Sequence, residues 1–174
     1  MNAVSLLRQQ VKEGHEWLEA IMSDVTPEMA KWAPPGQANP LGASYAHVVV
    51  GEDMVVNGML RRAATLFVRN YTAMQAVSEE PPQFPASWAE WARKVEIDLP
   101  KLREYAQALY ASTDEYLASL SEGDLEKKIT LPVEGMGEVS IAWMLSNTVL
   151  GHVHDHCGEI SCLKGMQGAK GYPA

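Results

Sequence analysis

The chain has 174 residues, of which 47% are hydrophobic, and its 22 acidic against 14 basic side chains give a net charge of −8. That length and apolar content suffice for one domain with a sizeable core, residues 1–174, and are too small for two. An acidic chain offers no basic surface to a phosphate backbone, so we expect no nucleic-acid partner.

The first stretch of the chain predicts an amphipathic helix over residues 3–23. Its apolar residues, from Val4 to Met22, recur at intervals of three, four or seven, and His15 lies on the same stripe. Arg, Lys and Glu are mixed among them, so the stretch lacks the apolar core and cleavage motif of a signal peptide. No other stretch is apolar over the roughly 18 residues that a membrane span needs. We therefore expect a soluble, cytoplasmic protein without a membrane partner.

A short helical turn and a second long helix are predicted next. Residues 26–32 begin with Thr26 as a cap, followed by a proline at the first helical position. After a Pro-Pro-Gly break, Asn39 is expected to cap a helix over residues 41–60, with Pro40 at its start. This helix carries few charges, so we interpret it as a core helix that neighbouring elements cover.

A proline-rich loop separates the second helix from the third. Residues 78–87, SEEPPQFPAS, contain three prolines and two acidic residues, which is typical of a loop that breaks helices. Ser87 and Glu90 then match the capping-box pattern at the start of a helix expected over residues 88–120. Pro100 lies inside this stretch and should kink or split the helix, because an interior proline costs about 3 kcal/mol.

The C-terminal part predicts a small hairpin and a fourth helix. Residues 128–140 resemble two very short extended pieces around Gly135 and Gly137. Ser140 is expected to cap the last helix, which extends over residues 141–163.

Four long helices, with a long crossover between the second and the third, predict an all-α protein folded as an up-down four-helix bundle. In such bundles, cofactor and metal sites are built from inward-facing side chains of facing helices. From about residue 165 the tail is rich in glycine and is expected to be irregular.

Histidines are concentrated in the last helix. The segment GHVHDHCGEI, residues 151–160, holds three of the five histidines of the chain. On a helix, residues four apart differ by about 40° in direction and about 6 Å in rise, so His152 and His156 can direct their imidazoles at one metal ion. His154 points about 200° away from that pair and is not expected to be a ligand. Without a third ligand, buried hydrogen-bonded histidines, or exposed ones at the mouth of a groove, are the simpler interpretation.

A third ligand has to come from another helix, where His15 and His47 remain. His47 lies in the apolar second helix, where burial of an unpartnered imidazole would be costly, and Gly51 one turn later leaves space beside it. His15 is explained as well by a hydrogen-bonded pocket residue as by a functional role. We therefore prefer His47. Three histidines with an open position are typical of catalytic zinc sites, and imidazole ligands also suit nickel, iron and copper.

Three blocks of the sequence carry a family resemblance: TPEMAKWAPPGQANPLGASYAHVVVGEDM, LPVEGMGEVSIAWML and HVHDHCGEISCLKGMQGAKGYP. They are similar to the corresponding blocks of the DinB/YfiT-like superfamily of bacterial metalloenzymes, over nearly the whole chain. The most specific element is the second-helix histidine followed by a late H-x-x-x-H-x-G-E/Q-I motif. The resemblance implies a four-helix bundle in which His47, His152 and His156 bind a divalent metal, usually nickel or zinc.

Glu159 is the candidate catalytic residue. It follows His156 by three residues and His152 by seven, so it lies on the ligand side of the helix and could orient an imidazole or shuttle a proton. A polar contact to a neighbouring helix, or a capping interaction, is an equally good explanation.

Other residues near the histidines are assigned structural roles. Asp155 and Asp53 are interpreted as solvated or structural, and Glu52, five residues after the second-helix histidine, does not share its face. Cys157 points about 100° away from the ligand beside it and is not counted as a ligand. Cys157 and Cys162 are expected to be reduced thiols, since their spacing is not C-x-x-C. The tryptophans are interpreted as core residues: Trp17, Trp32, Trp88, Trp91 and Trp143.

Two classes of function fit these observations. In the first, an enzyme, a fourth metal position carries water or a substrate thiol, whose pKa the metal lowers to produce a nucleophile. Related families imply S-transfer with low-molecular-weight thiols such as mycothiol or bacillithiol, and isomerisation of maleylpyruvate in one branch; a metal-dependent hydrolase is the variant in which water is activated. In the second, a non-catalytic module, the metal staples the bundle or the protein is a stress-induced binding protein. The helix faces then serve a dimer partner, and a homodimer is expected.

Overall fold

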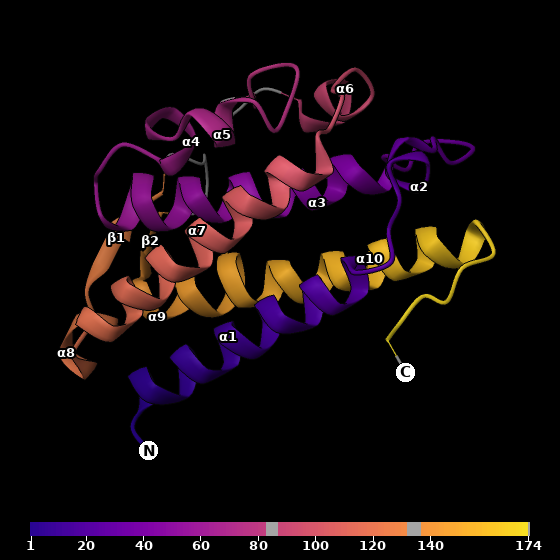
Figure 1. The fold of residues 1–174 in the computed structure, drawn as a ribbon. Helices are drawn as coiled ribbons and strands as arrows, with labels where there is room; N and C mark the ends of the chain where they lie inside the picture. Colours follow the sequence, from indigo (N-terminus) through magenta and orange to yellow (C-terminus); the bar gives the residue numbers. More distant parts are fainter. Residues whose placement is uncertain (83–86, 132–136, 174) are drawn as a thin grey trace.

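The protein is built mainly from helices, joined by short elements and one small hairpin. The computed structural model describes residues 1–82, 87–131 and 137–173. In chain order the elements, shown in Figure 1, are α1 (Ala3–Met22), α2 (Pro27–Lys31), α3 (Leu41–Asp53), η1 (Met54–Leu60), α4 (Leu66–Arg69), α5 (Tyr71–Met74), α6 (Trp88–Ala92), α7 (Leu99–Ser119), α8 (Glu122–Leu125), β1 (Lys128–Thr130), β2 (Glu138–Ser140), α9 (Ile141–Trp143), η2 (Met144–Gly151) and α10 (His152–Met166).

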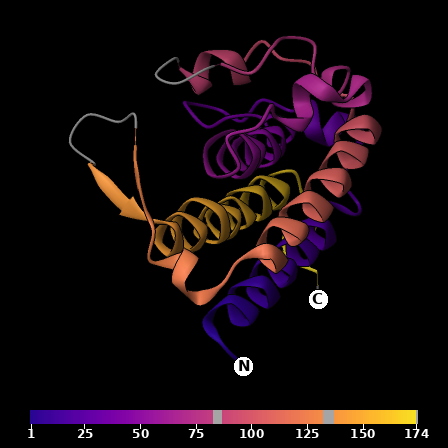
Figure 2. The same cartoon turned by 90° about the vertical axis from the view of Figure 1, so that its left-hand side faces the viewer.

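Four helical stretches form the body of the protein: α1, α3, α7, and α10 with the preceding η2. Helix α1 packs against α7 and α10, and α3 packs against the same two helices. The end view in Figure 2 shows these helices around a common interior. The all-α class predicted from the sequence is confirmed. No helix among the described residues combines the length and the apolar character needed to cross a membrane.

Apolar side chains fill this interior in two clusters. The larger cluster draws fully buried residues from α1, α7 and α10, among them Leu18, Leu109 and Ile160. The smaller cluster, which contains Val11 and Leu145, also contacts Ile129 of the hairpin. Polar groups in such an interior need hydrogen-bond partners or ions, because burying them unpaired is costly.

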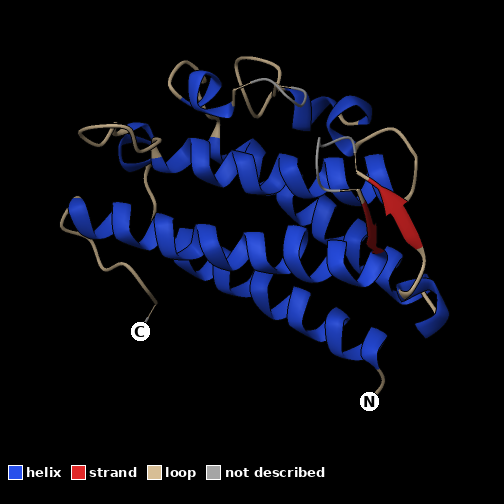
Figure 3. Ribbon diagram, turned by 180° about the vertical axis from the view of Figure 1, so that it is seen from behind, coloured by secondary structure: helices blue, strands red, loops and turns tan. Residues whose placement is uncertain are grey.

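The connection between α3 and α7 is more broken than the sequence predicted. It passes over these two helices as the short helices α4, α5 and α6 (Figures 1 and 3). The helix expected over residues 88–120 is split into α6 and α7, and Pro100 lies in the first turn of α7, where a missing N–H is tolerated. Asp98, not Ser87, supplies a side-chain cap, so the predicted capping box is not formed. Pro85 of the predicted loop lies outside the described residues.

Two of the long helices contain π-helical turns that were not predicted. Instead of uninterrupted α-helices over residues 41–60 and 141–163, η1 continues α3, and η2 lies between α9 and α10. The two π-helical segments contact each other. π-Helical turns are rare and frequently occur at functional sites. Because η2 ends at Gly151, directly before the first histidine of the motif, an α-helical stripe alone could not set the direction of that histidine relative to the residues before it.

Of the four predicted helix caps, two are observed and two, Ser87 and Asn39, are wrong. The Thr26 hydroxyl accepts a hydrogen bond from the Met29 amide at the start of α2, and Ser140 caps α9 in the same way. Asn39 does not cap α3. The cap position is occupied by Pro40, which makes no side-chain hydrogen bond.

The predicted hairpin is formed by β1 and β2, which pair antiparallel with Ile129 opposite Val139. Gly137 adopts a φ of +61°, in the left-handed region that favours glycine. Gly135 lies outside the described residues. Figure 3 shows the hairpin at one end of the long helices. At the C-terminus, α10 extends to Met166 before the irregular tail begins.

Candidate metal centre

Three histidines from two neighbouring helices meet between α3 and α10. His47 lies on α3, and His152 and His156 lie one turn apart on α10, which packs directly against α3. The Nε2 atom of His152 is 3.0 Å from Nε2 of His47 and 3.1 Å from Nε2 of His156. One nitrogen from each ring lies within 4.8 Å of the other two. The structure therefore brings together the three residues proposed from the sequence as metal ligands.

The environment of these rings keeps two of them uncharged. Burial, together with repulsion from the neighbouring imidazoles, lowers the pKa of His47 from 6.5 to about 3 and that of His152 from 6.5 to about 4. A neutral imidazole is the form that binds a metal ion. Nitrogen lone pairs that converge on one point favour a cation between them.

Glu159 contacts the third imidazole of the cluster. Its Oε2 lies 2.6 Å from Nδ1 of His156, three residues earlier on α10. This hydrogen bond lowers the pKa of Glu159, so the carboxylate is ionised and accepts the Nδ1 proton. The tautomer that results leaves Nε2 of His156 free to bind a metal. Ser44, one turn before His47, is 2% exposed, and its hydroxyl makes no hydrogen bond to the residues that the structure describes.

A glycine and a tryptophan shape the surroundings of the rings. A Cβ atom at Gly51 would lie 3.4 Å from Cε1 of His152, so the glycine leaves room for the His152 ring. The prediction that it leaves space beside His47 is wrong. Trp88 meets His47 edge-on, with ring centroids 4.4 Å apart at 68°. Trp88 therefore belongs to the surroundings of the histidines. The expectation that the tryptophans are core residues is wrong for a different one, Trp17, which is 38% exposed.

The three rings fit a divalent ion. Tetrahedral coordination at about 2.0–2.1 Å places two ligand nitrogens roughly 3.3 Å apart, close to the observed 3.0 and 3.1 Å. Small rotations of the side chains would therefore suffice. The buried Nδ1 of His47 has no hydrogen-bond partner among the described residues. The ring is therefore positioned by its packing against Trp88 and not by a hydrogen bond from Nδ1. A set of imidazole donors suits zinc, nickel and copper.

Comparison with known proteins assigns the chain to a family. The DinB superfamily matches residues 10–160. The chain belongs to the DinB superfamily. A solved structure of a conserved protein from Enterococcus faecalis has the same fold, with a TM-score of 0.79 at 19% sequence identity over 94% of this chain and 96% of that chain. No curated protein matches the chain. The family resemblance carried by the sequence blocks is therefore confirmed.

The other two histidines of this DinB superfamily member lie outside the cluster. His154 is exposed on α10. His15 is buried, and its Nε2 lies 2.8 Å from Oε2 of Glu52, whose Oε1 accepts a 2.6 Å hydrogen bond from the Thr113 hydroxyl. Of the two interpretations left open for His15, the structure shows the hydrogen-bonded one. Glu52 does not join the three-histidine cluster, but it is a buried partner whose contact with α1 the sequence did not indicate.

The remaining polar residues near the DinB superfamily motif have separate surroundings. Asp53 is buried and accepts hydrogen bonds from the Tyr105 hydroxyl and from two backbone amides at the start of α4, so its role is structural and not solvated. Asp155 is exposed. Cys157 is buried, Cys162 is exposed, and both are free thiols. Burial raises the pKa of the Cys157 thiol to about 11, which disfavours the thiolate that a metal would bind.

Proposed function

We propose that this DinB superfamily protein binds a divalent metal, nickel or zinc, through His47, His152 and His156. The observation that supports the proposal is the convergence of three Nε2 atoms from two facing helices, with separations of 3.0 and 3.1 Å between neighbouring nitrogens. Among the described residues, these three are the ones whose ligand atoms meet in this way. Three protein ligands leave a coordination position open, as in catalytic zinc sites.

We propose further that the centre is catalytic and acts on a small molecule, as a thiol-dependent S-transferase or a metal-dependent hydrolase. A divalent ion held by neutral imidazoles keeps its double charge and lowers the pKa of a thiol or water beside it. Glu159 orients His156 through the 2.6 Å hydrogen bond. Its ionised carboxylate is also a group that can take up a proton from the nucleophile.

Elemental analysis of protein purified without a histidine tag tests the metal site. We expect about one nickel or zinc ion per chain, and loss of this ion when His47, His152 or His156 is replaced by alanine. His154→Ala is the matched control, because this histidine lies on the same helix but is exposed. Loss of the metal in His154→Ala together with its retention in His47→Ala would overturn the assignment.

Turnover is tested separately on the metal-loaded and chelator-treated forms. The panel contains low-molecular-weight thiols with electrophilic acceptors, for S-transfer, and simple esters, for hydrolysis. We expect turnover by the loaded form alone. A bound metal that raises the melting temperature, without turnover and with a dimeric mass in solution, would favour the other class of function, a metal-stabilised interaction protein.

A further inference from the structure

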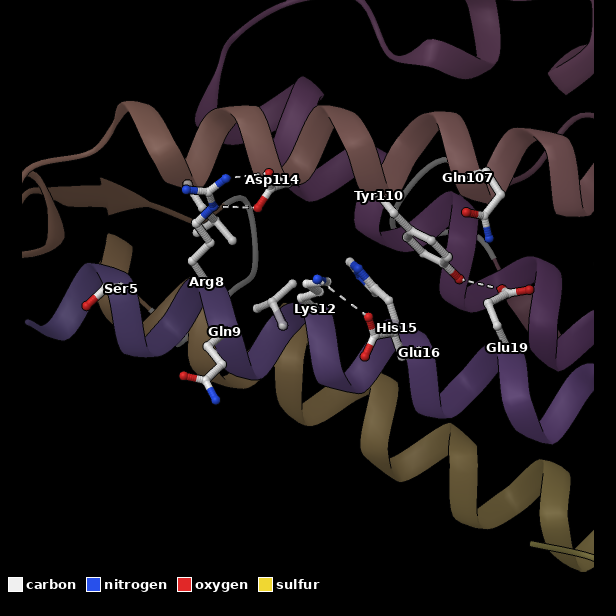
Figure 4. Close-up of a pocket in the computed structure, with 12 residues that line it drawn as sticks. Ser5, Arg8, Gln9, Lys12, His15, Glu16, Glu19, Gln107, Tyr110 and Asp114 are labelled. Atoms are coloured by element: carbon white, nitrogen blue, oxygen red, sulfur yellow. Dashed lines mark hydrogen bonds and ion pairs between the residues drawn. The ribbon is translucent and has the colours of Figure 1, made fainter. Parts of the chain in front are cut away.

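A groove lies between α1 and α7, on the side of the interior opposite the α3–α10 contact. Its volume is about 800 Å³, a size typical of small-molecule sites. Two rows of side chains, spaced by three or four residues, face each other across it (Figure 4): Arg8, Lys12, His15 and Glu19 from α1, and Tyr110 and Asp114 from α7. None of the three candidate metal ligands lines this groove.

The floor of the groove is polar and is held in place by hydrogen bonds. The ring of His15, which is 5% exposed, stacks on Tyr110 with centroids 3.9 Å apart. Its Nε2 lies 2.8 Å from Oε2 of Glu52. The Oε1 atom of Glu19 accepts hydrogen bonds from the hydroxyls of Tyr110 at 2.9 Å and Tyr45 at 2.7 Å. The second oxygen, Oε2 of Glu19, receives no hydrogen bond from the residues that the structure describes. An acceptor is therefore available at the floor.

At the rim of the groove, the positive charges already have partners. Arg8 forms two hydrogen bonds to Asp114, at 2.5 and 2.7 Å. Lys12 lies 3.7 Å from Glu16. Each cation is thus balanced by a carboxylate beside it, and the rim contributes little net charge.

At the floor, one carboxylate has no cationic partner. Asp114 and Glu16, which also line the groove, each pair with a basic side chain, whereas Glu19 forms no ion pair with the residues that the structure describes. Glu52, which does not line the groove, is paired with His15. Burial raises the pKa of Tyr45 and Tyr110 well above 10, and the neighbouring Glu19 raises both further, so the two phenols remain neutral donors. The floor therefore favours a positively charged ligand that brings its own hydrogen-bond donors.

We propose that the groove binds an alkylamine in its ammonium form, with the ammonium group at Oε2 of Glu19 and the hydrocarbon chain along Val11 and Leu117. The ammonium group supplies the missing donor in a charge-assisted hydrogen bond. Val11 and Leu117, which line the same groove, offer apolar contacts that a bare inorganic cation could not use. The site is independent of the proposed metal function, since it uses none of the three histidines.

Titration of the zinc-loaded, ¹⁵N-labelled full-length protein with n-hexylammonium chloride tests the proposal by NMR. We expect shifts of the backbone signals of residues 15, 19 and 110, and the same result for chelator-treated protein. 1-Hexanol has the same chain without the charge, and ammonium chloride has the charge without the chain. Both should bind roughly tenfold more weakly or worse. Equal binding of hexanol, or shifts confined to residues around His47 and His152, would overturn the proposal.

Variants of the groove test the position of the ammonium group. Glu19→Gln retains an acceptor for the two phenols but removes the charge, and should weaken hexylammonium binding roughly tenfold. Glu16→Gln removes the same charge from the exposed rim and should change affinity by less than about twofold. Gln107→Lys places a positive charge at an exposed position of the groove lining, where folding is not at risk, and should also weaken binding. Equal losses in Glu16→Gln and Glu19→Gln, or unchanged affinity in Gln107→Lys, would contradict the assignment.

Discussion

Two histidine-containing sites lie in the same helical interior and are built in opposite ways. Between α3 and α10, three imidazoles turn nitrogen atoms toward one another, and a carboxylate, Glu159, contacts only the outer nitrogen of one ring. Between α1, α3 and α7, a single imidazole, His15, meets a carboxylate that is also hydrogen-bonded by Thr113. In the second site each oxygen of Glu52 has a hydrogen-bond partner within the protein. The first site leaves lone pairs for a cation, so we expect the three-histidine cluster to bind a metal ion and the His15–Glu52 pair to stabilise the fold.

The largest expected difference between the two sites is the effect on zinc binding of removing one imidazole ring from each. His152→Ala is expected to abolish stoichiometric zinc binding, because two imidazoles remain, whereas His15→Ala should still bind one zinc per chain. Competition with a chelating dye, followed by elemental analysis, measures both. Circular dichroism establishes that each variant is folded. Loss of zinc from folded His15→Ala would mean that the two sites act as one.

In the metal-free protein, the variant at the His15–Glu52 site should lower the free energy of unfolding more than the variant at the three-histidine site. Glu52→Ala leaves His15 and Thr113 buried without their partner, and we expect the free energy of unfolding to fall by about 3–5 kcal/mol. His152→Ala removes a ring from a crowded cluster that lacks its ion, and should cost less than about 2 kcal/mol. Urea unfolding of chelator-treated protein measures both values. A loss for His152→Ala as large as that for Glu52→Ala would show that the three-histidine cluster is itself a stabilising element.

Local helical geometry explains how much of the fold was predictable. The stripes from Val4 to Met22 and from Ile141 to Leu163 depend only on spacing, so the long helices and the all-α class followed from them. The split before Pro100 was one of two outcomes allowed for a proline within a helix. The π-helical turns η1 and η2 were not predictable, because they depend on how neighbouring helices pack and not on a residue pattern.

The candidate site was predictable to the extent that it is local. His152 and His156 are four residues apart on one helix, so their shared direction is a property of the helix itself. His47 was preferred over His15 because it lies in the apolar second helix, and the family resemblance then pointed to the same residue. The His15–Glu52 contact joins residues 37 positions apart. It depends on the rotation of two helices about their axes, which tertiary packing determines.

Replacement of Glu159 tests whether the three-histidine site needs an oriented ring. Glu159→Ala removes the acceptor of the His156 Nδ1 proton, and we expect zinc affinity to fall by about 10- to 100-fold. Glu159→Gln should recover part of the loss, because the amide oxygen can still accept that proton. Asp155→Asn is the matched control, since it removes the same charge from an exposed position on α10. A similar loss in Asp155→Asn would indicate a general charge effect instead of orientation.

The smallest expected effect is a dependence of the free energy of unfolding on pH, which begins only in the alkaline range. Burial raises the pKa of Tyr110 well above 10, and its hydroxyl donates to Glu19. An unfolded tyrosine releases its proton near pH 10, so above that value the unfolded state binds fewer protons than the folded state. The stability that Tyr110 contributes is therefore complete below pH 10 and is lost as the pH rises further. The slope should approach about 1.4 kcal/mol per pH unit for each such tyrosine.

Urea unfolding between pH 7 and 11.5 measures this slope and its origin. Tyr110→Phe should lower stability at pH 7 by about 0.5–1.5 kcal/mol, through the lost hydrogen bond, and should make the alkaline slope shallower by one tyrosine. Tyr172→Phe, at a half-exposed position, is the control and should leave the slope unchanged. His152→Ala should leave it unchanged as well, because its imidazole, with a pKa lowered to about 4, has no proton to release in this range. An alkaline slope that responds to His152→Ala and not to Tyr110→Phe would place the titrating group at the metal centre, and the contrast between the two sites would fail.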